Sequence, residues 1–117
     1  MMIGVDVVAV GRMREMLIRS PRLKTRLFTE GERIYCEGMP DPAAHFAGTL
    51  AAKEAVMKAL QVGSLGAWAR RIEISRNTAG APAASVIGTE PGSLAISISH
   101  DGGVAVAVAV ATDTLKS

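Results

Sequence analysis

The chain begins with an apolar run, residues 2–10, which one charged residue, Asp6, interrupts. The run is rich in Val and ends at Gly11, which predicts a buried β-strand. Residues 12–19 carry apolar side chains at helical spacing and stop before Pro21, which predicts a short helix. A carboxylate in an apolar strand is costly to bury unless it is paired or binds a cation, so Asp6 is a first candidate for function.

A long helix is predicted from Asp41, an N-cap type of residue, with Pro42 at the first helical position and Gly63 as the breaker at its end. Its apolar stripe, at spacings of three and four, consists of Phe46, Leu50, Met57 and Leu60. Lys53 stands in this stripe where an apolar residue is expected, and Glu54 borders it. Charges against an apolar face often mark a functional site.

A shorter helix is predicted around residues 29–35, where Thr29 and Glu32 have the spacing of a capping box. After the long helix the hydrophobic period changes to two, and the predicted strands cover residues 71–75, 84–87, 94–99 and 104–110. Asp101-Gly102 predicts a tight hairpin between the last two. The last strand alternates Val and Ala, so both of its faces should be covered. The predicted fold is α+β, a mainly antiparallel sheet packed against one long helix, in a single domain over residues 1–117.

Composition narrows the class of protein. Hydrophobic residues make up 49% of the chain and charged residues 21%, which excludes a disordered protein. Aromatic residues are only 3%, so most core side chains are small and bury little area at about 25 cal/mol per Å². Burial against further copies would therefore help, which favours a homo-oligomer.

One Cys and two His leave no disulfide framework and no Cys-rich zinc site. The start lacks the features of a secretory signal, and the longest apolar run, residues 102–111, is shorter than the about 20 residues of a membrane span, so we expect a cytoplasmic protein.

Positive charge is concentrated near the N-terminus. Residues 11–26 carry six cationic side chains, Arg12 and Arg14 among them, against the single Glu15, on a chain of formal net charge +2. Such a segment is either a solvated helix face or a surface for an acidic partner: nucleic acid, anionic lipid, a phosphate-rich ligand or an acidic protein.

Two carboxylates and one lysine form the main candidate site. Asp6 and Glu54 would meet if the long helix crossed the first strand, and together they would suit Mg²⁺, which takes carboxylates, waters and phosphate oxygens. Alternatively, Asp6 caps a turn or pairs with Lys53. Lys58, four residues after Glu54, is either half of a surface pair worth about 0.3–0.5 kcal/mol or a cation for the same phosphates. A Ser-His-Asp hydrolase is not supported, because Ser99, His100 and Asp101 are consecutive.

Several segments in this order resemble one family, the holo-acyl-carrier-protein synthases, which are the short 4′-phosphopantetheinyl transferases. The matching segments are residues 3–8 with Arg12, residues 27–32, residues 51–55 with Lys58, and residues 96–100. The resemblance spans residues 3–110. The chain departs from the family pattern at Thr49-Leu50, Gln61-Val62-Gly63 and Gly80-Ala81-Pro82, where residues that help to hold coenzyme phosphates are expected. These departures concern coenzyme affinity more than the type of reaction.

The resemblance implies an activity: transfer of 4′-phosphopantetheine from coenzyme A to a serine of apo acyl carrier protein, releasing adenosine 3′,5′-bisphosphate. It implies that Asp6 and Glu54 ligate Mg²⁺ and act in catalysis with Lys58, and that Glu54 or a metal-bound water is the base. The implied coenzyme-binding residues are Lys58, Gly63, Ser99 and His100. The implied partner is an acidic carrier protein, free or a domain of a fatty-acid synthase, which would meet Arg12 and Arg14. The family forms homotrimers with sites between neighbouring copies, and neither nucleic acid nor membrane is an expected partner.

Two other functions remain as alternatives. The pI of about 9.0 and the arginines of residues 11–26 also fit a small nucleic-acid-binding module, although the few aromatics leave little for base stacking. The departures at Thr49 and Gln61-Val62 also fit a catalytically inactive interaction domain on the same scaffold.

Overall fold

The computed structural model describes residues 1–88 and 93–112, and in them the chain forms helices and antiparallel strands. The strands are β1 (Met2–Ala9), β2 (Ile72–Arg76), β3 (Pro82–Val86), β4 (Leu94–Asp101) and β5 (Val104–Ala111). The helices are α1 (Val10–Arg19), α2 (Pro21–Leu27), α3 (Glu30–Glu37), α4 (Pro42–Leu60) and α5 (Leu65–Trp68). Strands β1, β5 and β4 form one sheet in that order, and β2 and β3 form a second. The α+β prediction is confirmed; the predicted single domain also includes residues 89–92 and 113–117, which lie outside the described residues.

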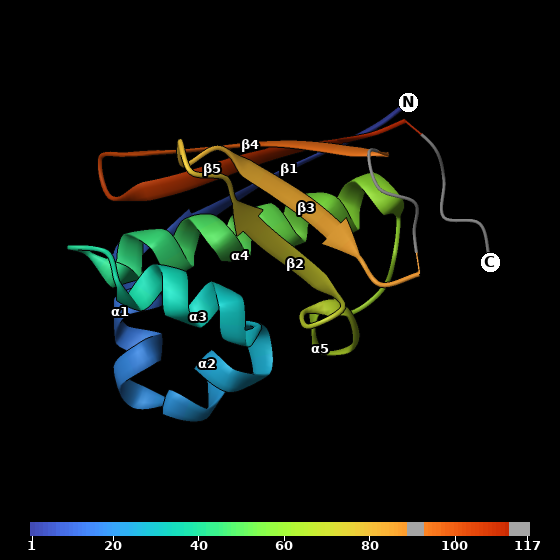
Figure 1. The fold of residues 1–117 in the computed structure, drawn as a ribbon. Helices are drawn as coiled ribbons and strands as arrows, with labels where there is room; N and C mark the ends of the chain where they lie inside the picture. Colours follow the sequence, from blue (N-terminus) through green and yellow to red (C-terminus); the bar gives the residue numbers. More distant parts are fainter. Residues whose placement is uncertain (89–92, 113–117) are drawn as a thin grey trace.

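Helix α4 lies in the middle of the molecule. The three-stranded sheet packs along one side of it, and α1 and α3 pack on another (Figure 1). Fourteen of its nineteen residues are buried, so the predicted stripe is part of a helix enclosed on almost all sides. Strand β1 crosses α4 so closely that a Cβ at Gly4 would overlap the carbonyl oxygen of Ala55. This crossing places Asp6, two residues further along the same face of β1, against α4.

Several local predictions need correction. Asp41 is the N-cap residue of α4 and Pro42 its first helical residue, as predicted, but the Asp41 carboxylate accepts from Arg14 at 3.0 Å rather than from the helix backbone. Helix α4 ends at Leu60 rather than near Gly63, because Gln61 takes the left-handed conformation with φ of 56° and turns the chain there.

The helices around α4 also differ from the sequence prediction. Pro21 follows the end of α1 as predicted but also opens α2, which was not predicted. Proline suits the first helical position because a backbone N–H there would have no partner within the helix, so its absence costs nothing. Helix α5 was not predicted either, and it has only four residues. The capping box of α3, with Thr29 and Glu32, is confirmed.

The β4–β5 hairpin follows the prediction. Gly102 and Gly103 both have positive φ, and they join strands that pair up to Asp101 and Val104. The alanines of β5 face α4 and are buried. Its valines face the other way, on a surface with these exposed side chains: Ile3 (65%), Val5 (51%), Val7 (58%) and Val108 (39%). The expectation that both faces are covered is therefore met on the alanine face only, as far as the described chain shows.

Hydropathy does not point to a membrane span. Within residues 1–88 and 93–112, none of the helices has both the length and the apolar character that crossing a bilayer requires.

Candidate functional site

Asp6 and Lys58 form an ion pair where β1 crosses α4. The Lys58 Nζ donates to Asp6 Oδ1 and to the carbonyl oxygen of Val5, each at 3.0 Å. The Asp6 side chain is 13% exposed and that of Lys58 58% exposed, so the carboxylate is recessed and the ammonium faces solvent. The alternative pairing of Asp6 with Lys53 is wrong. The other oxygen, Asp6 Oδ2, is buried and has no hydrogen-bond partner among the described residues.

Glu54 lies beside this carboxylate, as predicted from the crossing of helix and strand. Burial first, and then the neighbouring Asp6 carboxyl, raise the pKa of Glu54 to about 7, while the charge of Lys58 opposes the rise. Glu54 can donate to the Asp6 carboxylate only while it keeps its proton; once both groups are ionised they can only accept, and the buried Asp6 Oδ2 then lacks a donor. A cation between the two would satisfy both groups.

The donor set fits a hard divalent cation. Mg²⁺ is usually held by one or two carboxylates, with waters and substrate phosphates completing the octahedron. No group of three or more His, Cys, Asp or Glu side chains suited to a metal occurs in the described parts of the chain. The remaining ligands of such an ion would therefore come from water and from a bound phosphate compound.

A pocket of about 310 Å³ opens next to Glu54 and Lys58. Its other lining residues are Met57, Gln61, Val62, Gly63 and Leu65. The left-handed Gln61 turns the chain back to form this wall, and Gly63 lies in it without contacts that a Cβ would disturb. The predicted residue Gly63 thus lines the same pocket as Glu54 and Lys58.

Ser99 and His100 lie elsewhere. Ser99 is exposed on the outer face of the sheet opposite Val106, and His100 packs edge-on to His45 of α4 with ring centroids 5.7 Å apart. His45 precedes Glu54 by nine residues, which is about 13 Å along a helix. One copy of the chain therefore does not bring Ser99 and His100 into contact with the carboxylate cluster.

The sequence does not single out His45, because a lone histidine in an apolar helix belongs to no motif. Burial lowers the pKa of His45, and the nearby His100 and Arg76 lower it further, against a smaller effect of Asp41. The Tyr35 ring packs on His45 from the other side, with centroids 5.8 Å apart.

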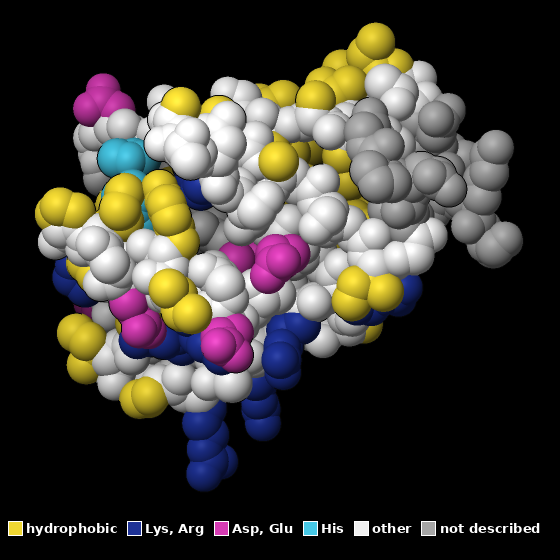
Figure 2. All heavy atoms as spheres, viewed as in Figure 1, with side chains coloured by type: hydrophobic (Ala, Val, Ile, Leu, Met, Phe, Trp, Pro, Cys, Tyr) yellow, Lys and Arg dark blue, Asp and Glu magenta, His cyan; other side chains and the backbone are white. Residues whose placement is uncertain are grey.

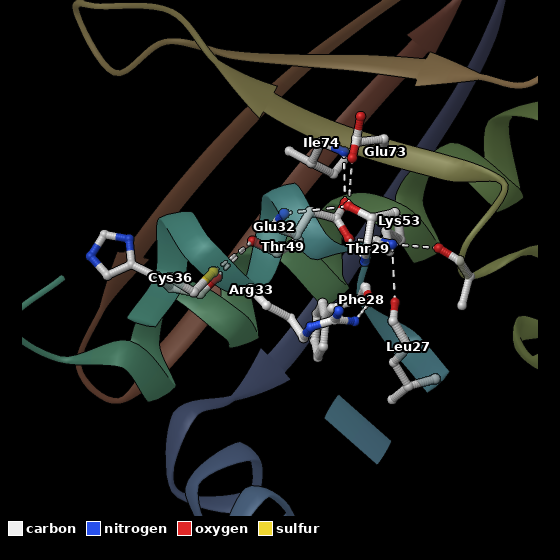
Figure 3. A network of polar contacts seen from close by, with 12 residues as sticks. Leu27, Phe28, Thr29, Glu32, Arg33, Cys36, Thr49, Lys53, Glu73 and Ile74 are labelled. Atoms are coloured by element: carbon white, nitrogen blue, oxygen red, sulfur yellow. Dashed lines mark hydrogen bonds and ion pairs between the residues drawn. The ribbon is translucent and has the colours of Figure 1, made fainter. Parts of the chain in front are cut away.

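A second charged cluster, which the sequence analysis did not predict, lies one residue from Glu54. Lys53 and Glu32 are both fully buried, and the Lys53 Nζ lies 2.6 Å from Glu32 Oε1 (Figure 3). Burial raises the pKa of Glu32 and lowers the pKa of Lys53, and each charge opposes the shift of the other. Lys53 is therefore enclosed and cannot reach a ligand. The capping-box pattern pointed to Glu32, but nothing in the sequence indicated its second partner.

The predicted partner-binding residues lie on α1. Arg12 and Arg14 are exposed, and the charge of Arg14 is partly neutralised by its pair with Asp41. Lys and Arg side chains protrude from the end of the molecule that α1 and α2 form (Figure 2). There, a hollow of about 470 Å³ is lined in part by Arg19, Arg22 and Arg26.

Comparisons with known proteins agree on one family. The sequence model of the 4′-phosphopantetheinyl transferase superfamily matches residues 2–110. The holo-[acyl-carrier-protein] synthase of Chlorobium limicola is 40% identical, over 94% of this chain and 92% of that protein. The holo-[acyl-carrier-protein] synthase of Helicobacter pylori, solved in complex with coenzyme A, superposes with a TM-score of 0.80 at 31% identity and covers 95% of this chain and 100% of its own.

The enzyme from Bacillus anthracis, also solved with CoA (3′,5′-ADP), gives a TM-score of 0.81 at 30% identity and covers 94% of both chains. The fold, the family match and the identity over nearly the whole length of the relatives lead to the same assignment. The chain belongs to the 4′-phosphopantetheinyl transferase superfamily and is an enzyme of its holo-[acyl-carrier-protein] synthase type.

Proposed function

We propose that this chain transfers 4′-phosphopantetheine from coenzyme A to a serine of an apo acyl carrier protein, in a Mg²⁺-dependent reaction. One observation carries the proposal: the buried, unpartnered oxygen of Asp6 beside the Glu54 carboxyl, with the Lys58 ammonium at the same place. Asp6 and Glu54 would hold the ion. When bound, Mg²⁺ supplies a counter-charge for the pyrophosphate of the coenzyme.

The transfer exchanges one phosphorus–oxygen bond for another. The serine oxygen bonds to the phosphorus that carries pantetheine, the bond from that phosphorus to the bridging oxygen breaks, and adenosine 3′,5′-bisphosphate leaves. The serine proton needs a base, and the Glu54 carboxylate or a metal-bound water would take it. The exposed Lys58 Nζ can turn from Asp6 toward a phosphate oxygen, and Gly63 leaves room for the coenzyme in the adjacent pocket.

We also propose that the active enzyme is a homotrimer. The outer face of the three-stranded sheet exposes Ile3, Val5 and Val7 next to the valines of β5, an apolar surface of the kind that marks a protein interface. The family resemblance puts sites between neighbouring copies, which would bring Ser99 and His100 of one copy to the carboxylates of the next. Light scattering should then give three times the chain mass of 12.2 kDa. A Val5→Lys variant should give smaller particles and lose coenzyme binding, and a monomeric wild-type enzyme would contradict this part of the proposal.

The proposed acceptor is an acidic carrier protein that docks on the basic end. The exposed charge of Arg12 and Arg14 would speed the encounter and add little specificity. The carrier could be a free protein or a domain of a fatty-acid synthase, so both kinds belong in the assay.

Intact-mass analysis tests the function directly. Apo acyl carrier protein incubated with this protein, coenzyme A and Mg²⁺ should gain the mass of one phosphopantetheine group, and EDTA should prevent the gain. No gain with any of several carriers would favour an inactive scaffold, and a coenzyme A titration with and without Mg²⁺ would then show whether the donor binds at all. Tight, salt-dependent binding of oligonucleotides would favour the nucleic-acid module instead.

A further inference from the structure

The Glu32–Lys53 pair is unusual because two full charges are taken completely out of water. Both side chains are 0% exposed. Such a pair is tolerated only when further hydrogen bonds satisfy the remaining donors and acceptors. Here they do: Glu32 accepts from the backbone N–H of Thr29 at 2.8 Å and of Ile74 at 2.7 Å. The Lys53 ammonium donates to the carbonyl oxygens of Leu27, at 3.0 Å, and Ala69.

These partners come from separate parts of the fold. Leu27 ends α2, Glu32 lies in α3, Ile74 lies on β2, and Ala69 follows α5. In Figure 3 these contacts converge on the pair formed by Glu32 of α3 and Lys53 of α4. Lys53 is thereby fixed against α2, α3 and the segment after α5, and its partner Glu32 adds the contact with β2. A second layer extends the network, since Thr29 donates its hydroxyl to Glu73 Oε2 at 2.6 Å.

The buried pair and the three-stranded sheet hold α4 from different sides, and small residues of α4 pack closely on that sheet. Where α4 meets β1, Gly4 lies directly against the backbone of Ala55 and Ala59. Glu54 follows Lys53 directly, so both move with the same turn of the helix. A rotation of about 20° would move a group about 5 Å from the helix axis by nearly 2 Å. That displacement would separate Glu54 from Asp6.

The same ammonium also anchors the wall of the pocket. The chain leaves α4 at Leu60, forms the wall with residues 61–65, and returns through α5 to Ala69, whose carbonyl oxygen Lys53 holds. Both ends of this excursion are therefore attached to α4. Losing the Ala69 contact would free one end of the segment that carries Gly63.

We propose that Lys53 and Glu32 are positioning residues for the transfer reaction: their buried pair fixes the rotation of α4 that aims Glu54 at Asp6 and holds the pocket wall of residues 61–65 in place. This inference rests on the proposed Mg²⁺ site. Neither residue touches coenzyme or carrier, so their effect is on the number of productive complexes rather than on carrier binding.

The test is the neutral double variant Glu32→Gln/Lys53→Met, which removes both charges at similar volume and so avoids an unpaired buried charge. It should fold with a lower melting temperature than wild type, because Lys53→Met leaves the carbonyl oxygens of Leu27 and Ala69 without this donor. Its kcat, measured at low temperature where every variant is folded, should fall about 10- to 100-fold, because a misplacement of about 1 Å can cost that much. Its KM for the carrier protein should stay within twofold. Mn²⁺ affinity in the presence of coenzyme A, measured by electron paramagnetic resonance, should fall at least fivefold.

Ile72→Val is the matched control, because it removes one methyl group from the core beside α4 and leaves the pair intact. Its kcat and Mn²⁺ affinity should equal those of wild type even if its stability is lower. A folded double variant with wild-type kcat and Mn²⁺ affinity would overturn the proposal. If the double variant does not fold, Glu32→Gln, which turns one acceptor oxygen into a donor, is judged by the same two readings. Failure of wild type itself to bind Mn²⁺ or transfer would instead contradict the proposed function.

Discussion

Two charged clusters meet on α4 at adjacent residues, and they differ in how fully their polar atoms are paired. Around Lys53 and Glu32, exposure is zero and both charged groups are held by backbone partners as well as by each other. Around Asp6 and Glu54, the side chains are partly exposed, one buried oxygen has no hydrogen-bond partner among the described residues, and two acidic groups lie side by side. A charged residue on a buried helix face can therefore indicate either of two things: a completed structural ion pair or an incompletely paired site for a ligand.

The difference separates structure from chemistry. A completed network contributes to a unique, rigid arrangement and leaves nothing for a ligand to bind. An incomplete one costs folding free energy, which a cation or a phosphate can recover on binding. Lys53 and Glu54 are neighbours in sequence, yet Lys53 is enclosed in a completed network and Glu54 is left open to a ligand.

The largest expected effect is on the incomplete cluster. Glu54→Gln keeps the size and helix preference of the side chain but removes the charge that would ligate Mg²⁺. Transfer should fall by about 100- to 1,000-fold or more, with an unchanged circular dichroism spectrum. Mass-spectrometric transfer assays on protein free of wild-type enzyme measure this, and near-full activity with Mg²⁺ would rule out the assignment.

The two lysines should respond in opposite ways to truncation. Lys53→Met leaves Glu32 charged and buried without its partner, which should cost about 3–5 kcal/mol of unfolding free energy. Lys58→Met removes one half of a largely exposed pair and should cost less than about 1 kcal/mol, while transfer activity falls. Urea denaturation of both variants measures the two losses of stability. Equal losses would contradict the contrast between a buried pair at Lys53 and an exposed pair at Lys58.

The pH dependence of stability should expose the cost of the incomplete cluster. The folded-state pKa of Glu54, about 7, lies above the ordinary value of 4.5, so the folded form binds this proton more tightly than the unfolded form. Stability from this group is therefore present below pH 4.5 and is lost as pH rises toward 7. Glu54→Gln should melt higher than wild type by a margin that grows between pH 4.5 and 7.5, as scanning calorimetry can measure. Saturating Mg²⁺ with coenzyme A should reduce the margin, and a margin independent of pH would contradict the raised pKa.

The smallest effects belong to the basic end. Arg12→Glu should raise the KM for the carrier protein several-fold and flatten its dependence on salt, since the charge acts mainly through encounter. Arg14→Glu should have a similar effect and in addition breaks the pair with Asp41. Steady-state kinetics at two salt concentrations compare them, and an unchanged KM in both would remove α1 from the docking surface.

The sequence alone was sufficient for features set by neighbours along the chain. The capping box of Thr29 and Glu32 and the glycine hairpin at Gly102 were predicted because the required residues lie within a few positions of each other. The meeting of Asp6 and Glu54 was also predictable, because an acidic residue on the helix-facing side of an apolar strand must lie against the helix that packs there. Family resemblance then indicated the chemistry.

Tertiary structure decided which charge has which partner. Lys58 rather than Lys53 pairs with Asp6, and Glu32 binds a second partner beyond its own helix. At the N-cap of α4, the Asp41 side chain pairs with Arg14 rather than with the helix backbone. Local patterns specify backbone geometry, since hydrogen bonds within one turn depend on nearby residues. Long side chains choose among partners that only packing brings within about 3 Å, and burial then determines whether that partnership is structural or is left open for a ligand.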